Sequence, residues 1–311
     1  MVSRLTRRSV SLILSHMTDV RHAALPADGD QAAHTGTEWF ALGQRAEGDG
    51  DLDAGWRAYA AAVARDPRQP EWLYRLGCVS RKLGLLAEAV DAFRRAAELA
   101  PEEARHLLNL GTVFDRLGQR EEAVRSYQAA LSRDPRNAEA HNNLGAIHAE
   151  AGRSEEAVRS FEAAIAARPD AQGWQNLGLV HFHQDDFERA LHCFEQVLLL
   201  APDSALGHYY AGLCQMRKGL YREAMVRFRR AFELDSRLGR AQFHAGACLH
   251  KVGRFDEALL ALRRALESFP EDPRLHYQLG LTCDALLLHQ EARQHYRHAR
   301  AVNAGGFGGT L

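Results

Sequence analysis

The stretch that decides the fold runs from residue 104 to residue 170: ARHLLNLGTVFDRLGQREEAVRSYQAALSRDPRN (104–137), then AEAHNNLGAIHAEAGRSEEAVRSFEAAIAARPD (138–170). Both segments carry a Leu-Gly pair, an Ala twelve residues after that Gly, a ring four residues later and a closing Pro. The Gly recurs along the chain with spacings of 34, 34, 34, 33, 34, 34 and 34 residues. The eight glycines are Gly43, Gly77, Gly111, Gly145, Gly178, Gly212, Gly246 and Gly280. A period this regular indicates one structural unit stacked repeatedly, not a single globular core.

Each unit contains two helical patterns separated by a breaker. The breakers are Gly84, Gly118, Gly152, Gly219 and Gly253. The second pattern mostly ends at a proline, which lacks the N–H group and restricts the residue before it. A glycine inside a helix costs about 1 kcal/mol relative to alanine. We therefore expect the eight repeated glycines to lie at close helix–helix crossings that leave no room for a Cβ.

The large–Leu-Gly…Ala…Phe…Ala…Pro pattern over residues 36–306 resembles that of the tetratricopeptide repeat (TPR) family. The resemblance implies an all-α, right-handed superhelical α-solenoid of antiparallel helix pairs. The eight implied repeats are 36–69, 70–103, 104–137, 138–170, 171–204, 205–238, 239–272 and 273–306. Residues 1–35 are expected to form a helix and linker that docks on the first repeat, lies on a membrane surface or is disordered. Residues 307–311 are expected to be a flexible tail.

Composition and motifs argue against several classes of function. A net charge of −1, from 39 basic and 40 acidic residues, argues against nucleic acid as a partner. We find no phosphate-binding loop, HExxH or GxSxG motif, so we expect no enzyme, no cofactor and no metal. The sixteen histidines are interpreted as solvated or packed, because no acidic or Cys partner recurs at ligand spacing.

The cysteines, the hydropathy and the amino-acid composition bear on the location and the source of the protein. The five cysteines lack CxxC spacing and are interpreted as small buried thiols in a reducing compartment. No apolar run approaches the roughly 18 residues of a membrane span. Only three of the 39 basic residues are Lys, which with abundant Ala and Gly suggests a bacterial genome. We expect a cytoplasmic protein.

Two departures from the repeat pattern carry local predictions. Helix positions that are apolar in repeats two to seven become Arg293 and Arg300 in the eighth, as a solenoid cap requires. The fourth repeat is one residue short before Trp174, with Gly173 nearby. A bend between repeats four and five is expected there, although sequence drift without structural effect is the alternative.

In TPR arrays the first helix of each pair lines the concave groove, and carrying the groove positions over gives two candidate zones. The first is a run of amides similar to part of the asparagine ladder of the O-GlcNAc transferase superhelix. Its members are Asn109, Asn142, Asn143, Gln175 and Asn176. An amide offers a donor and an acceptor together, which matches a peptide unit whatever its side chain. The alternative is that these amides are simply the inherited family consensus.

The second zone is apolar and rimmed by cations. Its apolar members are Leu179, Phe182, Tyr209, Tyr210, Leu213, Met216, Phe243, Tyr277 and Leu281, and its cations are Arg217, Arg240, Lys251 and Arg274. Such a surface suits an extended or helical peptide with bulky side chains and acidic flanks. The alternative is ordinary packing, because rings are frequent at these family positions. The heat-shock chaperone clamp is excluded, because no repeat combines its Lys and Asn.

The leading hypothesis is a non-catalytic protein–protein interaction scaffold that binds a peptide or partner segment in the groove. The main alternative is an accessory or substrate-recruiting subunit of a separate enzyme or envelope assembly complex. A third hypothesis is self-association through the first repeat, which depends on whether residues 1–35 cover Trp39, Phe40 and Trp56. The sequence does not name the partner, because a fold does not imply a function.

Overall fold

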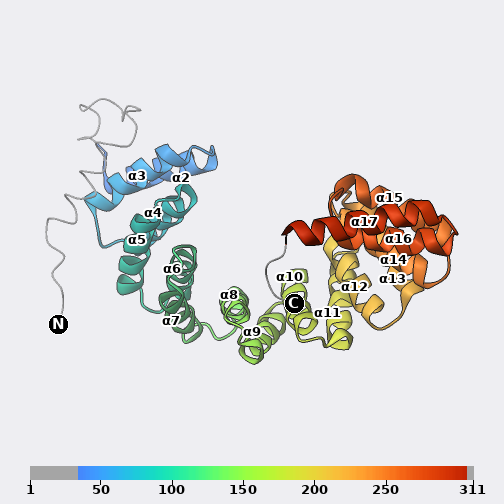
Figure 1. Ribbon diagram of the computed structural model, residues 1–311. Coiled ribbons are helices and arrows are strands. Elements are labelled where there is room, and N and C mark those ends of the chain that lie inside the picture. Colours follow the sequence, from blue (N-terminus) through green and yellow to red (C-terminus); the bar gives the residue numbers. More distant parts are fainter. Residues whose placement is uncertain (1–33, 307–311) are drawn as a thin grey trace. The chain divides into compact units, whose positions relative to one another are not determined.

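The computed structural model describes residues 34–306 (Figure 1), and the predictions for residues 1–33 and 307–311 lie outside that range. The described residues form sixteen helices and no strand. The first helices of the repeats are α2 (Gly36–Gly48), α4 (Pro70–Leu83), α6 (Ala104–Arg116), α8 (Ala138–Glu150), α10 (Ala171–His183), α12 (Ala205–Arg217), α14 (Gly239–Lys251) and α16 (Pro273–Ala285). The second helices are α3 (Leu52–Arg65), α5 (Leu86–Leu99), α7 (Arg120–Leu131), α9 (Ser154–Ala167), α11 (Phe187–Leu200), α13 (Tyr221–Leu234), α15 (Phe255–Ser268) and α17 (His289–Gly306). The predicted all-α fold of helix pairs is confirmed.

The turn inside each repeat needs one residue in the left-handed region. Six repeats place a glycine there, with φ between 72° and 80°. In the fifth and eighth repeats the residue is Asp185 (φ 58°) and Leu287 (φ 63°). A residue with a Cβ costs roughly 1–2 kcal/mol in this conformation. The turn geometry is thus imposed by the repeat and kept even where the sequence does not favour it.

The repeated glycines make room for a large side chain of the same repeat, which is a ring in seven repeats and Leu262 in the seventh. A Cβ on Gly77 would lie 2.7 Å from the ring of Phe93, and one on Gly145 would lie 2.6 Å from the ring of Phe161. Each ring follows its glycine by sixteen residues, on the second helix. The expected lack of room for a Cβ is therefore confirmed. The nearest obstacle is the side chain packed between the helices rather than the backbone of the second helix.

Local capping residues mark several of the helix starts. Thr35 and Glu38 form a capping box at the start of α2. The Asn137 side chain accepts a hydrogen bond from the N–H of Ala140, and the Asp170 side chain accepts one from the N–H of Gly173. These side chains satisfy backbone donors that the first turn of a helix leaves unpaired.

The chain divides into two compact units after Arg133. The first unit contains α2–α7 and the second contains α8–α17. The residue-short turn lies inside the second unit. There α9, α10 and α11 share one core that includes Phe161, Ile165, Leu177 and Cys193. The division of the chain therefore does not fall at the turn where the sequence indicates a bend.

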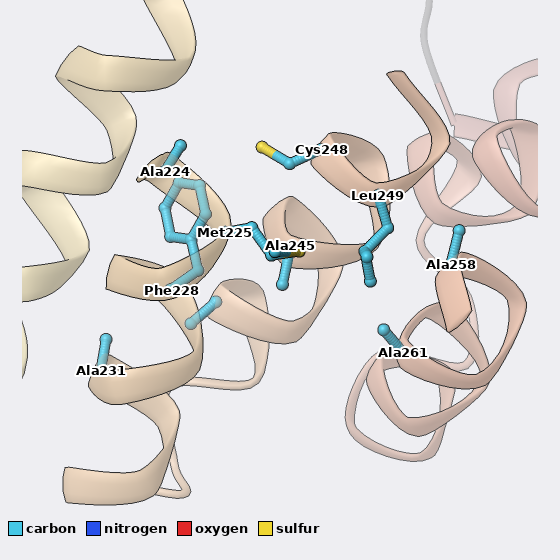
Figure 2. Packing of buried hydrophobic residues seen from close by; sticks show 10 residues of the cluster. Ala224, Met225, Phe228, Ala231, Ala245, Cys248, Leu249, Ala258 and Ala261 are labelled. Carbon is cyan, nitrogen blue, oxygen red and sulfur yellow. The ribbon is translucent and has the colours of Figure 1, made fainter. Parts of the chain in front are cut away.

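The core runs through each unit as small residues packed around rings. Figure 2 shows one such cluster, built from α13, α14 and α15. Phe228 is fully buried, while Met225 lies between α13 and α14 near Ala245. Full burial of a side chain of this size contributes roughly 1.5–3 kcal/mol. Within each unit, a second helix thus packs against its own repeat and against the first helix of the repeat that follows it in that unit.

The buried cysteines belong to this core. Cys193, Cys214, Cys248 and Cys283 are buried and all five cysteines are free thiols, as predicted. Burial raises the pKa of Cys193, Cys214 and Cys248 to about 12. These thiols are therefore protonated at neutral pH and pack as small apolar groups.

Two further observations concern the surface. Arg293 and Arg300 are exposed, whereas the corresponding residues of the seventh repeat, Leu259 and Leu266, are buried and half-buried. Among the described residues, no helix is long and apolar enough to span a bilayer.

Candidate functional site

The first helices form one face of the second unit. The neighbouring first helices α12 and α14 contact each other, as do α14 and α16 and also α8 and α10. The second helices of neighbouring repeats make no comparable contact among the described residues. The first helices therefore lie on the tighter, inner side of the stack. This is the side on which the candidate residues were placed.

Five rings form a continuous row across this face, which we call the aromatic row. It comprises Phe182 on α10, Tyr210 and Tyr209 on α12, and His244 and Phe243 on α14. Successive ring centroids lie 5.9, 5.4, 5.8 and 5.0 Å apart. All five side chains are half-buried, so each packs one side on the core and leaves the other accessible. Ring pairs at these separations attract one another beyond their area of burial.

A pocket of about 600 Å³ continues the row, and we call it the C-terminal pocket. It is lined by Phe243, Pro273, Arg274, Tyr277, Gln278, Tyr296, Ala299 and Arg300. Tyr277 is 54% exposed, and its ring centroid lies 5.8 Å from that of Tyr296. Three of the predicted site residues, Phe243, Arg274 and Tyr277, therefore meet in one concavity.

The other apolar candidates lie along the same helices and are half-buried. Leu179 packs with Phe182 against the core around α10, α11 and α12, while Leu213 and Met216 pack against the core around α13, α14 and α15. Leu281 is also half-buried. These residues therefore pack against the core and do not extend the aromatic row.

The predicted cations are exposed, and two of them lie over rings. The guanidinium of Arg217 is 5.6 Å from the ring centroid of Phe187, and that of Arg240 is 5.9 Å from that of Phe269. Lys251 and Arg274 are exposed as well. Among the described residues, none of these four cations has a carboxylate within ion-pair distance. Within the described part of the chain, their charge is therefore not neutralised by an acidic side chain.

The pKa of His244 shows how burial and nearby cations act on the aromatic row. Burial lowers the pKa of its imidazole to about 4, with smaller contributions from Arg240 and Arg217. The two guanidiniums therefore act on the same point of the surface. The imidazole is neutral at pH 7 and behaves as one more ring.

The predicted amide run is only partly assembled. Asn142 and Asn176 lie side by side, with Asn176 Nδ2 donating to Asn142 Oδ1 at 2.9 Å, and Gln172 donates to Asn176. Asn143 and Gln175 are half-buried beside them. Asn109 belongs to the first unit, where its amide donates to the Arg105 carbonyl of its own helix. Of the predicted amides, Asn142 and Asn176 are thus engaged with each other.

The first unit differs in its charges. Glu47 accepts a hydrogen bond from the hydroxyl of Tyr59 and pairs with Lys82 at 2.7 Å. Glu71 pairs with both Arg75 and Arg105. Lys82, Arg75 and Arg105 are thus neutralised by neighbouring acids, in contrast to the cations around the aromatic row. The aromatic rings Trp39, Phe40 and Trp72 form its first core.

Sequence reasoning missed several contributors. Tyr296 and Arg300 both line the C-terminal pocket, although the repeat pattern predicts Arg300 only as part of a cap. Tyr296 occupies the ring position of the eighth repeat, which is the signal in the sequence. The two candidate zones also omit His244, which lies in the aromatic row.

The structure also assembles a group that the sequence does not reveal. Cys283, Glu291 and His295 each place a ligand-type atom within 4.8 Å of the other two. Cys283 lies on α16, while Glu291 and His295 lie on α17. The sulfur comes from a different helix, so no short motif joins the three residues.

Known proteins place this chain in a family. A profile described as tetratricopeptide repeat matches residues 40–104, 108–172 and 249–305, and a second of the same description matches residues 171–204. No curated protein matches the chain significantly.

Solved structures show the same fold. The C-terminal part of a TPR repeat-containing protein from Cytophaga hutchinsonii is 17% identical, with a TM-score of 0.65, covering 77% of this chain and 99% of that one. YrrB, described as a TPR protein with an unusual peptide-binding site, is 24% identical with a TM-score of 0.55, covering 59% of this chain and 95% of that one. MamA from Desulfovibrio magneticus RS-1 is 20% identical with a TM-score of 0.52, covering 54% and 96%. Repeating helix pairs, glycine–ring packing and the matching profiles lead to one conclusion: the chain belongs to the tetratricopeptide repeat family.

Proposed function

We propose that the second unit is a non-catalytic scaffold that binds a peptide segment of a partner protein along the aromatic row and in the C-terminal pocket. The segment carries bulky apolar side chains flanked by acidic residues. The observation that carries this proposal is the concavity of about 600 Å³ in which Phe243, Tyr277 and Tyr296 meet Arg274 and Arg300. Apolar surface rimmed by one sign of charge is typical of a binding site.

The chemistry of the surface favours a peptide over a small polar metabolite. Accessible rings offer large apolar contact at a low cost in conformational entropy, and such rings dominate the energy of protein interfaces. The flanking guanidiniums have no acidic partner among the described residues, so a carboxylate of the peptide gains a charge-assisted hydrogen bond there. The peptide-binding description of YrrB is consistent with this use of the fold.

The test is a binding titration with fluorescent peptides that carry Leu and Trp residues between Asp and Glu, against the same peptides with Lys flanks. Tyr277→Ala and Arg274→Glu should each weaken binding of the acidic-flanked peptide about tenfold, a loss typical of an interface hot spot. Arg264 is an exposed residue on α15 that does not line the C-terminal pocket. Arg264→Glu makes the same charge change there and should leave the affinity unchanged. Affinity should also fall with ionic strength, because salt screens exposed charges.

Two results would contradict the proposal. One is equal affinity for acidic-flanked and Lys-flanked peptides. The other is a loss of binding in Arg264→Glu as large as that in Arg274→Glu. The accessory-subunit alternative requires a separate enzyme whose activity depends on this chain, and the same Arg274→Glu variant should then uncouple the two proteins.

A further inference from the structure

The group formed by Cys283, Glu291 and His295 has the ligand types of a zinc site. Thiolate, imidazole and carboxylate are the three side chains that bind Zn²⁺ in proteins. Among the described residues, only this group brings three such ligands within 4.8 Å of one another. The ligands of a tetrahedral zinc ion lie about 3.3–3.8 Å apart, because zinc–ligand bonds are about 2.0–2.3 Å long. Small rotations of Glu291 and His295, both half-buried, would close the difference.

The hydrogen-bond pattern behind the group fixes which nitrogen of His276 carries a proton. Its Nε2 lies 2.8 Å from the carbonyl oxygen of Pro270. A carbonyl only accepts, so this Nε2 carries the proton and donates. The same bond recurs in two other repeats, where His141 faces Pro135 and His208 faces Pro202, each at 3.0 Å. It is therefore a fixed part of the turn.

The position of this proton also determines which nitrogen of His295 donates a hydrogen bond. In the tautomer that carries its proton on Nε2, His276 presents a lone pair at Nδ1, which lies 3.0 Å from Nδ1 of His295. His295 must then donate from Nδ1, and its Nε2 is left with a lone pair. This Nε2 lies 4.0 Å from Oε1 of Glu291. The lone pair on His295 Nε2 is then directed at a carboxylate oxygen that also accepts from Arg263, and both atoms are available as ligands of a cation.

We propose that Cys283, Glu291 and His295 bind a zinc-type divalent cation, with water as the fourth ligand and His276 as the residue that orients His295. Such an orienting hydrogen bond to the second imidazole nitrogen accompanies nearly every metal-bound histidine. Thiolate and carboxylate together balance the charge of the ion, and Arg263, which pairs with Glu291, faces the site from α15. The ion would join α16 to α17, which together line most of the C-terminal pocket.

Cobalt(II) is the probe, because a thiolate–cobalt bond gives an ultraviolet charge-transfer band and tetrahedral cobalt gives strong visible bands. Chelator-stripped, reduced full-length protein should develop both with a single equivalent of Co²⁺, and Zn²⁺ should abolish them. Cys283→Ser should lose the charge-transfer band. Glu291→Gln and His276→Ala should weaken Co²⁺ binding at least tenfold, the latter as expected for loss of an orienting residue.

Cys248→Ser is the matched control, because Cys248 is an equally buried thiol on the preceding first helix. It should keep the cobalt bands, and circular dichroism should show each variant folded. If Cys283→Ser does not fold, Glu291→Gln, which alters a half-buried side chain, decides alone. No charge-transfer band in the wild-type chain, or a band that survives Cys283→Ser, overturns the proposal. Zinc should also raise the melting temperature of the wild-type chain but not that of Cys283→Ser.

Discussion

His244 is the residue at which the aromatic row becomes sensitive to pH. It stacks on Phe228 with ring centroids 5.3 Å apart and lies between Tyr209 and Phe243. Burial among these rings lowers the pKa of the imidazole to about 4, against an ordinary value of 6.5. The unfolded chain therefore binds a proton below pH 6.5 that the folded chain does not accept until about pH 4. Stability is lost as the pH falls through this window and is unaffected above it.

We expect His244→Phe to remove this dependence while keeping a ring in place. The free energy of unfolding should be similar to that of the wild type at pH 7.5. At pH 5 the variant should be more stable than the wild type by about 2 kcal/mol, from linkage between pKa values of about 4 and 6.5. Denaturant titrations at the two pH values measure the difference. His183→Phe, at an exposed position, should not raise the free energy of unfolding at pH 5 in this way. An equal gain in stability there would contradict the assignment to His244.

At the scale of the helix, the packing of each repeated glycine against a large side chain, a ring in every repeat but the seventh, sets how closely the two helices of a repeat approach. The first repeat contains a natural comparison. A Cβ on Gly43 would lie 2.6 Å from the ring of Tyr59, whereas a Cβ on Gly55 would find no atom nearer than 3.6 Å. Both glycines are buried inside helices, and the other seven repeats carry Ala at the position of Gly55.

Gly43→Ala and Gly55→Ala should consequently shift stability in opposite directions. Gly43→Ala should destabilise the chain by roughly 1–3 kcal/mol, the usual cost of overpacking. Gly55→Ala should stabilise it by up to about 1 kcal/mol, because alanine is the better helix former and has room. Melting temperatures of the two variants and the wild type provide the measurement. Destabilisation of similar size in both would mean that backbone approach, and not the ring, selects glycine.

For the whole molecule, the division after Arg133 separates three repeats from five. The second unit has its own core clusters and holds all of the aromatic row and the C-terminal pocket. Three or more repeats suffice for an independent solenoid, because each repeat is stabilised mainly by its neighbours.

We expect a fragment of residues 134–311 to fold alone, because the stability of a repeat array is a sum of contributions from each repeat and its neighbours. The fragment should bind the acidic-flanked peptide with the affinity of the full chain, within about threefold. Circular dichroism and the fluorescence titration test the two parts. Residues 1–133 should also be helical but should not bind this peptide. Binding that requires both fragments would place part of the site in the first unit.

The 34-residue period was enough to predict the helix pairs, their order and the family. Each repeat makes the same contacts with its neighbours, so the pattern in sequence is a direct record of the packing. The candidate apolar residues came from the resemblance to the family, and the structure brings Phe182, Tyr209, Tyr210 and Phe243 into one row of rings. Its use by a peptide, the cytoplasmic location, the bacterial source and self-association stay predictions.

What the period did not reveal lies where the repeats depart from their consensus. The pairing of Asn176 with Asn142, the opening beside Tyr296 and the division after Arg133 depend on side-chain placement and on which faces lack a neighbour. Cys283 approaches Glu291 and His295 from the neighbouring helix, and no pattern in the sequence shows that these three side chains meet. Repetition encodes contacts that every unit shares, and only the tertiary structure decides those that one unit makes by itself.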